Sequence, residues 1–389
     1  MNILFVTSST TIYGGGSKSF ILMLKGLMSY GIKPLVILPD NKGLFQLLQQ
    51  DGIACISLRY AYRMSVYPPT QTFKDKVLFI PRLIGRLLIN NLATLQLLHI
   101  TKRFTPDIIH TNVSVTAIGY YVARRLKIPH IWHIREYGDL DFNFFYYPSR
   151  HVQLERYKRP HSYTLCITKD IQEYNHLANW HNSRVIYNGI MSSVESHYQK
   201  TKKRYFLFAG RIEQAKGISD LIDAYAEYTK KTSFPIPLHI AGRGSSAYMT
   251  IIQNKIAQYN IKDNIVFLGM RKDILSLYKE ATALIVPSIS EGFGRISAEA
   301  MFCGCLVVGN DTAGIKEQFS IGKEISGQEI GLRYHTKEEL VQHLVDITIN
   351  PIDKFETMIL LGKQVAIQLY STEQHAQQVY NFYNKIITK

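Results

Sequence analysis

The sequence predicts an α/β protein with two doubly wound, Rossmann-like domains that face a central cleft. Its 389 residues correspond to two or three domains at roughly 150 residues each. Short apolar runs of strand length alternate with helical patterns along the whole chain. These runs are continuously apolar, which is typical of parallel strands buried on both faces. Ligands of such sheets bind at the carboxyl ends of the strands.

The first domain is predicted over residues 1–190. The N-terminal run Met-Asn-Ile-Leu-Phe-Val-Thr has the pattern of a first strand and lacks the basic region and cleavage site of a signal peptide. Helices are expected over 17–30, 82–101 and 113–125, among others. The predicted strands are 3–7, 34–38, 54–58, 107–110, 130–134, 164–167 and 184–187.

The second domain is predicted over residues 205–370, after a linker over 191–204. The linker segment is polar and basic and has no hydrophobic period. The chain ends in two helical patterns, about 351–369 and 372–387, and we expect the terminal helix (371–389) to pack back on the first domain. The predicted strands of the second domain are 205–209, 238–241, 265–268, 283–286 and 306–309.

Composition excludes several classes of protein. Apolar residues make up 46% of the chain and charged residues 19%, so the chain can bury large cores and is not intrinsically disordered. No stretch approaches about 18 consecutive apolar residues, as a membrane-spanning helix requires. The four cysteines are too few for a disulfide scaffold, and we expect reduced thiols in a cytoplasmic protein. They are Cys55, Cys166, Cys303 and Cys305.

The net charge of +15 predicts an anionic partner and lies mainly in the first half. Residues 1–190 hold 22 Lys and Arg against 10 Asp and Glu. Within 59–104, basic side chains alternate with apolar and aromatic ones, which is typical of a segment that contacts an anionic lipid surface. A solvated basic helix face is the alternative, and no nucleic-acid motif accompanies the charge. The basic residues are Arg59, Arg63, Lys74, Lys76, Arg82, Arg86, Lys102 and Arg103.

A glycine run, Gly14-Gly15-Gly16, lies between the first predicted strand and a helix. Glycines let backbone amides approach an anion closely, and a helix N-terminus favours negative charge. The run is not a G-x-G-x-x-G motif, and no well-placed acid follows about 20 residues later, so a dinucleotide site is not expected. It is either a phosphate-binding loop or a flexible turn.

Two cations follow the first strand of the second domain, in Gly210-Arg211-Ile212-Glu213-Gln214-Ala215-Lys216-Gly217. Arg211 offers a planar fork for a phosphate, and Lys216 offers a point charge. Together they could hold a diphosphate without a metal. Two solvated loop cations are the alternative.

Two carboxylates lie in Glu291-Gly292-Phe293-Gly294-Arg295-Ile296-Ser297-Ala298-Glu299, after strand 283–286. Glu291 precedes a predicted helix, and Glu299 lies about two turns into it. Carboxylates accept hydrogen bonds from pairs of sugar hydroxyls, and the glycines expose backbone amides at the helix start. A helix-capping acid plus a surface acid is the alternative.

Taken together, these motifs resemble the retaining GT-B glycosyltransferases of family 4. The likeness is strongest over about 205–320, and the glycine loop and the final helix extend it over nearly the whole chain. Glu-Gly-Phe-Gly-Arg at 291–295 and Trp-His-Ile-Arg-Glu at 132–136 resemble members that build bacterial surface polysaccharides. The motifs that carry the resemblance are Arg211…Lys216-Gly217, Gly242-Arg243-Gly244 and Glu291-x7-Glu299.

The resemblance implies roles for donor-binding residues. Arg211 and Lys216 would neutralise the diphosphate leaving group, and Glu299 would accept hydrogen bonds from the ribose. Glu291 would hold the sugar hydroxyls together with backbone amides near Phe293 and Gly294. The other expected donor-binding positions are Gly15, Gly16, Gly210, Gly242, Arg271 and Arg295, with the 269–271 stretch beside the nucleobase.

The resemblance also implies a first-domain residue at the sugar, which we expect to be His133, with Arg135 and Glu136 nearby. A strand-end histidine bonded to the backbone is the alternative for His133. Two segments depart from the family pattern. Asp-Thr-Ala-Gly-Ile at 311–315 lacks the usual paired glycines, and Gly-Arg-Ile at 294–296 replaces the more usual Gly-Leu-Pro.

The activity implied is transfer of a sugar, with retention of anomeric configuration, from a nucleotide-diphosphate sugar to a glycan or lipid-linked glycan. No metal or other cofactor and no nucleic acid would take part, and the enzyme would lie on the inner face of the cell membrane. The sequence leaves three alternatives. Asp139-Leu140-Asp141 spells the D-x-D of metal-dependent transferases. A nucleotide-sugar 2-epimerase shares the fold, and a non-catalytic nucleotide-sugar-binding subunit would share the site.

Overall fold

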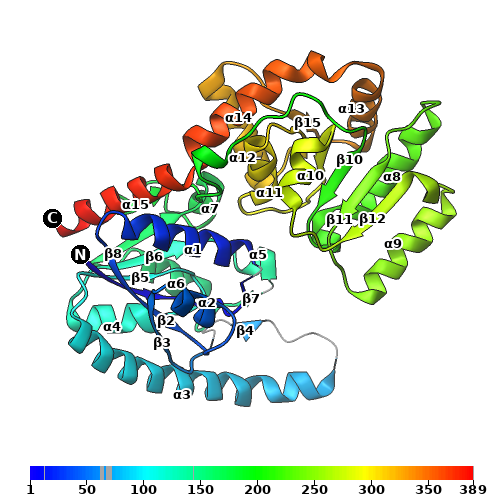
Figure 1. Cartoon of the computed structure of the whole chain (residues 1–389). Helices are drawn as coiled ribbons and strands as arrows, with labels where there is room; N and C mark the ends of the chain where they lie inside the picture. Colours follow the sequence, from blue (N-terminus) through cyan, green and yellow to red (C-terminus); the bar gives the residue numbers. More distant parts are fainter. Residues whose placement is uncertain (13, 62–64, 67–71, 143, 389) are drawn as a thin grey trace. The chain divides into compact units, whose positions relative to one another are not determined.

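The computed structural model describes residues 1–12, 14–61, 65–66, 72–142 and 144–388. The chain divides into two compact units (Figure 1). Unit 1 comprises Met1–Gly189 together with Thr372–Lys389, and unit 2 comprises Ile190–Ser371.

Unit 1 is built on a seven-stranded parallel sheet of order β3-β2-β1-β5-β6-β8-β9. Its central strand β1 pairs with β2 on one side and with β5 on the other, so that Ile3 lies beside Pro34 and Ile108. The strands are β1 (Asn2–Val6), β2 (Lys33–Leu38), β3 (Ala54–Ser57), β5 (Ile108–Thr111), β6 (His130–Ile134), β8 (Ser162–Cys166) and β9 (Ser183–Val185). A two-stranded antiparallel pair, β4 (Ser65–Val66) and β7 (Phe144–Phe145), lies outside this sheet.

Helices cover both faces of the unit 1 sheet (Figure 1). One apolar core lies under α1, α2 and α15, and the other under α3 and α4. Burial on both faces explains why the strands are continuously apolar. The helices are α1 (Gly15–Met28), α2 (Leu44–Gln50), α3 (Phe73–Phe104), α4 (Ile118–Leu126), α5 (Asp139–Phe142), α6 (Arg150–Tyr157), α7 (Lys169–Tyr174) and α15 (Thr372–Ile387).

Unit 2 has a six-stranded parallel sheet of order β12-β11-β10-β13-β14-β15. Helices α8, α9 and α13 pack against one core, and α11 packs with α14. The strands are β10 (Phe206–Ala209), β11 (Leu238–Ala241), β12 (Ile265–Gly269), β13 (Ala283–Val286), β14 (Leu306–Asn310) and β15 (Leu332–Tyr334). The helices are α8 (Ile218–Lys230), α9 (Ser246–Gln258), α10 (Ile274–Glu280), α11 (Arg295–Phe302), α12 (Ala313–Ser326), α13 (Lys337–Ile349) and α14 (Glu356–Tyr370).

The predicted strands coincide with observed strands to within a few residues, but β15 and the short pair β4–β7 escaped prediction. At three residues, β15 is too short for a clear apolar pattern. Helix α3 begins at Phe73 rather than at 82, because the Thr72 side chain accepts a hydrogen bond from the Asp75 amide and caps the helix there. Helix α4 begins at Ile118 rather than at 113.

Two segments near the boundary between the units carry long-range contacts. Residues 191–204, interpreted as a linker from the sequence, belong to unit 2, where Lys202 Nζ donates to the carbonyls of Lys279 and Gly304. Helix α15 belongs to unit 1, where it packs with α1 and buries Tyr383 in the core. The polar composition of 191–204 therefore reflects hydrogen bonding to one unit and not a lack of structure.

Helix α3 is long and apolar enough to cross a membrane, by length and composition alone, and it is the one such helix among the described residues. No apolar run of that length was expected from the sequence. The difference arises because polar residues such as Asn90 interrupt the apolar residues without lowering the average hydropathy below 1.3. Only 17% of the most apolar stretch is buried in the protein.

Candidate functional site

In unit 1, the glycine run lies at the carboxyl edge of the sheet, where β1 leads into α1. Gly14 occupies the N-cap position, and Gly15 and Gly16 form the first turn. No side chain of the described residues caps this turn, and no acid lies in it. A side-chain atom added at Gly16 would meet nothing within 4 Å. This helix end is therefore open to a ligand, as the phosphate-loop interpretation requires.

Two buried histidines lie side by side on the neighbouring strands β5 and β6. His110 Nε2 is 3.1 Å from His133 Nδ1, and His110 Nδ1 is 2.6 Å from the Tyr383 hydroxyl of α15. All three side chains are fully buried. Burial, followed by the positive charge of Arg135, holds the pKa of His133 well below its usual range, and the same causes act on His110. Both rings are therefore neutral near pH 7.

Arg135 fixes which nitrogen of each ring carries the proton. Its guanidinium lies 3.3 Å from His133 Nδ1, and because arginine only donates, this nitrogen must accept. His110 Nε2 then donates to His133, and His110 Nδ1 accepts from the Tyr383 hydroxyl. The proton of His133 consequently lies on Nε2, a buried atom without a hydrogen-bond partner among the described residues. The network thus prepares one N–H donor for a ligand acceptor.

The rest of this network holds Arg135 and Glu136 in place at the end of β6. Arg135 donates to Asn112 Oδ1 at 2.9 Å and to Asn188 Oδ1 at 2.5 Å. Glu136 Oε1 accepts from the backbone amide and hydroxyl of Ser114, at 2.8 and 2.7 Å. Arg135 and Glu136, the predicted neighbours of His133, therefore form hydrogen bonds to the surrounding loops. His110, Tyr383 and the two asparagines escaped prediction because their spacing in the sequence forms no motif.

In unit 2, the structure brings together Lys216 and Glu291, which lie 75 residues apart in the sequence. Lys216 Nζ forms an ion pair with Glu291 Oε2, and both side chains are less than one-fifth exposed. Gly217 permits this contact, because it has a φ of 65° and a side chain there would lie 1.8 Å from the Pro287 carbonyl. The loop after β10 therefore packs against the loop after β13, at the carboxyl edge of the sheet.

The predicted glycines and the other cations of this edge lie in the loops after β10, β11 and β12. Gly242 packs so closely on the Gly210 carbonyl that only glycine fits there. Arg211 is exposed and pairs with Glu213 at 3.0 Å, and Arg271 forms a bidentate pair with Asp273. Each of these cations is paired with a carboxylate two residues away in the sequence.

Helix α11 presents the second predicted carboxylate. Gly294 is its N-cap, and the Phe293 side chain is buried against Tyr370, so any contact of Phe293 with a ligand would use its backbone. Arg295 Nε donates to Glu299 Oε1 at 2.8 Å, and a second nitrogen of Arg295 donates to the Ile190 carbonyl. Arg295, expected to contact the donor, therefore holds Glu299 in position.

The turn that starts α12 supports the loop of Glu291. Gly314 N donates to the Glu291 carbonyl at 2.8 Å, and Gln318 Nε2 donates to the carbonyls of Phe293 and Gly294. Where the family has paired glycines, Ala313 takes the left-handed conformation with a φ of 45°. The segment 311–315 therefore forms a tight turn without paired glycines, and the backbone at Ala313 is strained.

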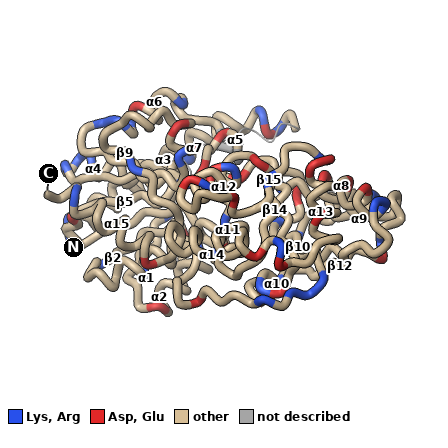
Figure 2. Tube along the Cα trace, turned by 90° about the horizontal axis from the view of Figure 1, so that it is seen from above, with Lys and Arg blue, Asp and Glu red and all other residues tan. Residues whose placement is uncertain are grey.

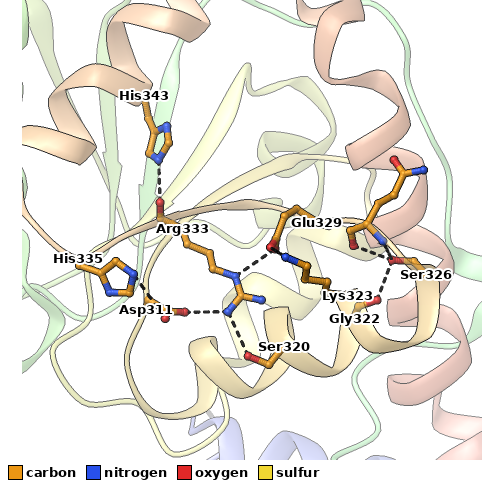
Figure 3. A network of polar contacts seen from close by, with 10 residues as sticks. Asp311, Ser320, Gly322, Lys323, Ser326, Glu329, Arg333, His335 and His343 are labelled. Atoms are coloured by element: carbon orange, nitrogen blue, oxygen red, sulfur yellow. Dashed lines mark hydrogen bonds and ion pairs between the residues drawn. The ribbon is translucent and has the colours of Figure 1, made fainter.

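A polar network fixes the end of β14, just before this turn (Figure 3). Arg333 on β15 donates to the buried Asp311 at 3.1 Å, to Glu329 at 3.1 Å and to Ser320 at 3.1 Å. His343 contacts the Arg333 carbonyl at 2.7 Å. Arg333, Ser320 and His343 lie on β15, α12 and α13, whereas Asp311 and Glu329 lie in the loops before and after α12. The sequence did not indicate this network.

Of the D-x-D sequence, Asp139 pairs with Arg150 and accepts from the Tyr174 hydroxyl at 2.6 Å. The side chain of Asp141 lies outside the described residues, as does Arg63 of the basic segment. Cys166, Cys303 and Cys305 are buried free thiols, as expected from the sequence, and Cys55 is partly buried.

Comparison with known proteins finds a family match that lies within unit 2. Residues 192–352 match the family described as glycosyl transferases group 1. An uncharacterized glycosyltransferase of Methanocaldococcus jannaschii is 28% identical over 183 residues, 46% of this chain and 45% of that protein. N-acetyl-alpha-D-glucosaminyl L-malate synthase of Bacillus anthracis is 25% identical over 46% of this chain and 45% of that protein. The chain spans about half the length of the curated relatives it matches.

The fold as a whole is also known. The Anabaena protein HepE, solved in complex with UDP, superimposes with a TM-score of 0.78 at 20% identity over 99% of this chain and 100% of that one. HepE has also been solved with UDP-glucose. The two parallel sheets with flanking helices are those of the GT-B fold. Residues 192–352 of this GT-B chain are thus similar to the glycosyl transferases group 1 family.

Proposed function

We propose that the protein is a retaining glycosyltransferase that moves a sugar from a nucleotide-diphosphate sugar, with UDP as the nucleotide, to a glycan acceptor. The observation that carries this proposal is the pairing of Lys216 with Glu291. A cation suited to a diphosphate and a carboxylate suited to sugar hydroxyls meet at the strand edge where such sheets bind ligands. The UDP and UDP-glucose complexes of HepE support the choice of nucleotide.

Donor binding would exchange this ion pair for two ligand contacts. Lys216 would turn to the diphosphate, joined by Arg211, and Glu291 would accept from hydroxyls of the sugar. Glu299, held by Arg295, would accept from the ribose. The cost of breaking the ion pair is offset only by a ligand that carries both a diphosphate and a sugar. We infer that the site selects the intact donor by this means.

The chemical step breaks the bond between the sugar and the phosphate oxygen and forms a bond to the acceptor oxygen on the same face. The acceptor proton passes to the leaving phosphate, so no separate base is needed. Negative charge grows on the diphosphate, and fixed cations stabilise it more in the transition state than in the ground state. Because Lys216 and Arg211 supply this charge, we propose that no metal ion is required.

We propose a glycan or lipid-linked glycan as acceptor, in the synthesis of bacterial surface polysaccharide or glycoconjugate on the inner face of the membrane. The excess of basic residues in 1–190 supports an acceptor at an anionic surface. The resemblance of the 132–136 and 291–295 motifs to polysaccharide-building members supports the same product class.

A panel of nucleotide sugars, scored first by binding and then by product formation with a lipid-linked glycan, tests the proposal. We expect UDP-sugars to bind and transfer in the presence of EDTA, with the anomeric configuration of the product unchanged by NMR. Donor turnover without acceptor would indicate an epimerase instead. Failure to bind any nucleotide sugar would indicate a subunit without catalytic function.

A further inference from the structure

Helix α3 presents a long apolar surface to solvent. Seven large apolar side chains along it are between 52% and 83% exposed. Isolated exposed apolar residues are common, but a continuous row of this length is not. We call this row the α3 stripe. It consists of Phe73, Val77, Ile80, Ile84, Leu88, Leu92 and Leu95.

The spacing of the α3 stripe, three or four residues at every step, places all seven side chains on one face of the helix. At 1.5 Å per residue the α3 stripe is about 33 Å long. The opposite face is the one that attaches α3 to unit 1, through buried residues from Leu83 onwards. Figure 1 shows the N-terminal part of α3 extending beyond the sheet, and no residue before Leu83 is buried there.

The charges around the α3 stripe are almost all positive. The helix carries six basic residues and one acid, Asp75, which is already engaged by Arg82 and Thr72. At about 100° per residue, Lys74 and Lys76 flank the stripe on its two sides and Lys102 continues its line. Figure 2 shows the Lys and Arg positions in blue and the Asp and Glu positions in red along the trace of the chain. The basic residues are Lys74, Lys76, Arg82, Arg86, Lys102 and Arg103.

The positive charges around the α3 stripe indicate what binds to this surface. Arg82 and Arg86 lie on the opposite face, but Lys74, Lys76 and Lys102 border the stripe. If two copies of the helix packed stripe to stripe, these lysines would face one another, which is unfavourable. An anionic bilayer satisfies both features, because its acyl chains take the apolar side chains and its headgroups take the cations.

The contacts of the buried face decide how the helix would meet the bilayer. Asn90 Oδ1 accepts from the Ala61 amide at 2.8 Å, and Ala93 and Leu97 pack in the core with α4. A helix that spanned the membrane would lose all of these contacts. A helix that lies flat keeps them and buries only the α3 stripe.

We propose that α3 is an in-plane membrane anchor, with the α3 stripe inserted among the acyl chains of an anionic bilayer and its lysines at the headgroups. This inference rests on the proposed function for its purpose, which is to bring the site to a lipid-linked acceptor. Binding of α3 to the bilayer does not itself depend on catalysis.

Flotation of the full-length protein with vesicles tests the anchor. We expect binding to vesicles of equal parts phosphatidylglycerol and phosphatidylcholine, and much weaker binding to phosphatidylcholine alone. The triple variant Ile80→Ser/Ile84→Ser/Leu88→Ser should lose binding by about tenfold or more, because three apolar side chains no longer insert. A matched control, Ile251→Ser/Phe234→Ser/Ile349→Ser, removes exposed apolar residues from unit 2 and should bind as the wild type does.

The depth of insertion distinguishes the in-plane anchor from a spanning helix. Single tryptophans at Ile80, Leu88 and Leu95, each in a Trp132→Phe/Trp180→Phe background, report depth by quenching with brominated lipids. We expect equal depths at the three positions. A steady gradient of depth along the helix would overturn the proposal in favour of a spanning helix, and stripe-dependent dimers without vesicle binding would overturn it in favour of a second copy.

Two further variants separate failure of the anchor from failure of the proposed function. Lys216→Ala should float as the wild type does while losing transfer. The triple α3 variant should keep its affinity for UDP-sugar and its thermal midpoint while losing flotation. A triple variant that still binds anionic vesicles like the wild type would refute the anchor and leave the transferase proposal untouched.

Discussion

The two units arrange their candidate functional residues in opposite ways. In unit 1, neutral buried rings are linked in a fixed order, from Tyr383 through His110 to His133. In unit 2, charged groups lie near the surface and pair with one another, as Lys216 does with Glu291. The first arrangement is complete except for one N–H donor. In the second arrangement, the ion pair between Lys216 and Glu291 must break before these two side chains can bind a ligand.

The two arrangements suit different tasks. The network of unit 1 positions a hydrogen-bond donor, and the charged groups of unit 2 can neutralise the charge of a ligand. A buried network holds a donor in place because its alternatives are unsatisfied polar groups, which are costly in the interior. A single ion pair between partly buried side chains is less constrained, because each charged group can exchange its partner for a ligand of the same charge sign. We therefore expect substitutions in the row from Tyr383 to His133 to affect stability together with rate, and substitutions of Lys216 or Glu291 to affect rate or binding alone.

The largest effect is expected for Lys216→Ala, which removes a fixed cation from the leaving group. Turnover should fall on the order of 10²- to 10³-fold, because loss of one preorganised donor costs roughly 3–4 kcal/mol in the transition state. The matched control is Lys255→Ala, which breaks the comparably exposed pair between Lys255 of α9 and Asp223 of α8. Wild-type turnover in Lys216→Ala would remove this residue from the site.

Acidification should destabilise unit 1 more than unit 2. Burial lowers the pKa of His375 to about 4 and that of His130 to about 3, whereas none of the unit 2 histidines is buried. Because the unfolded chain binds these protons first, the stability they contribute is complete above about pH 6.5 and is lost as the pH falls toward 4. The expected loss is about 3 kcal/mol for each histidine.

Tryptophan fluorescence measures this loss in unit 1 alone, because Trp132 and Trp180 both lie there. The denaturation midpoint should fall steeply between pH 6.5 and 4, and His375→Asn should flatten the curve. A midpoint independent of pH over this range would show that the buried histidines are not held neutral.

A smaller effect is expected for Tyr383→Phe, which removes the hydroxyl that donates to His110. The free energy of unfolding should fall by about 1–2 kcal/mol, since His110 Nδ1 loses its buried donor. Transfer should also slow several-fold, because His110 is no longer held in the tautomer whose Nε2 donates to His133. The control Tyr228→Phe removes the buried hydroxyl that pairs with Thr348 in unit 2 and should lower stability without changing transfer. Equal effects of the two variants on transfer would argue against the network.

The smallest effect is expected for Ala313→Gly, which relieves the left-handed strain at the start of α12. Unit 2 should gain about 1 kcal/mol at most, because glycine adopts this conformation freely but loses more backbone entropy. Thermal unfolding of the variant measures the gain. A loss of stability would show that the alanine side chain makes a contact that outweighs the strain.

Local patterns predicted most of the strands and singled out the individual candidate site residues. Strands β6, β11 and β13 match their predicted bounds because each is a continuous apolar run between polar segments. Lys216, Glu291 and Glu299 were found because they follow strands or start helices. Their pairing was not predictable, since it depends on how closely Gly217 packs on Pro287, a contact between two distant loops.

The unit 1 network escaped prediction for a related reason. His110 lies on a different strand from His133, and Tyr383 comes from the other end of the chain. Sequence spacing cannot reveal that three residues so far apart form one hydrogen-bonded row. The basic segment was predicted from the sequence to contact lipid. Its apolar stripe could be identified only from the structure, which shows which side chains of α3 are buried and which are exposed.

Calorimetric titration with two ligands tests most directly whether Lys216 binds the diphosphate and Glu291 the sugar. We predict that Lys216→Ala weakens binding of both UDP and the UDP-sugar by about tenfold or more. Glu291→Gln should weaken only the UDP-sugar and leave UDP binding unchanged or tighter, because it releases Lys216 from its ion pair. If both substitutions weakened the two ligands equally, or neither changed either affinity, the division of roles between Lys216 and Glu291 would be wrong.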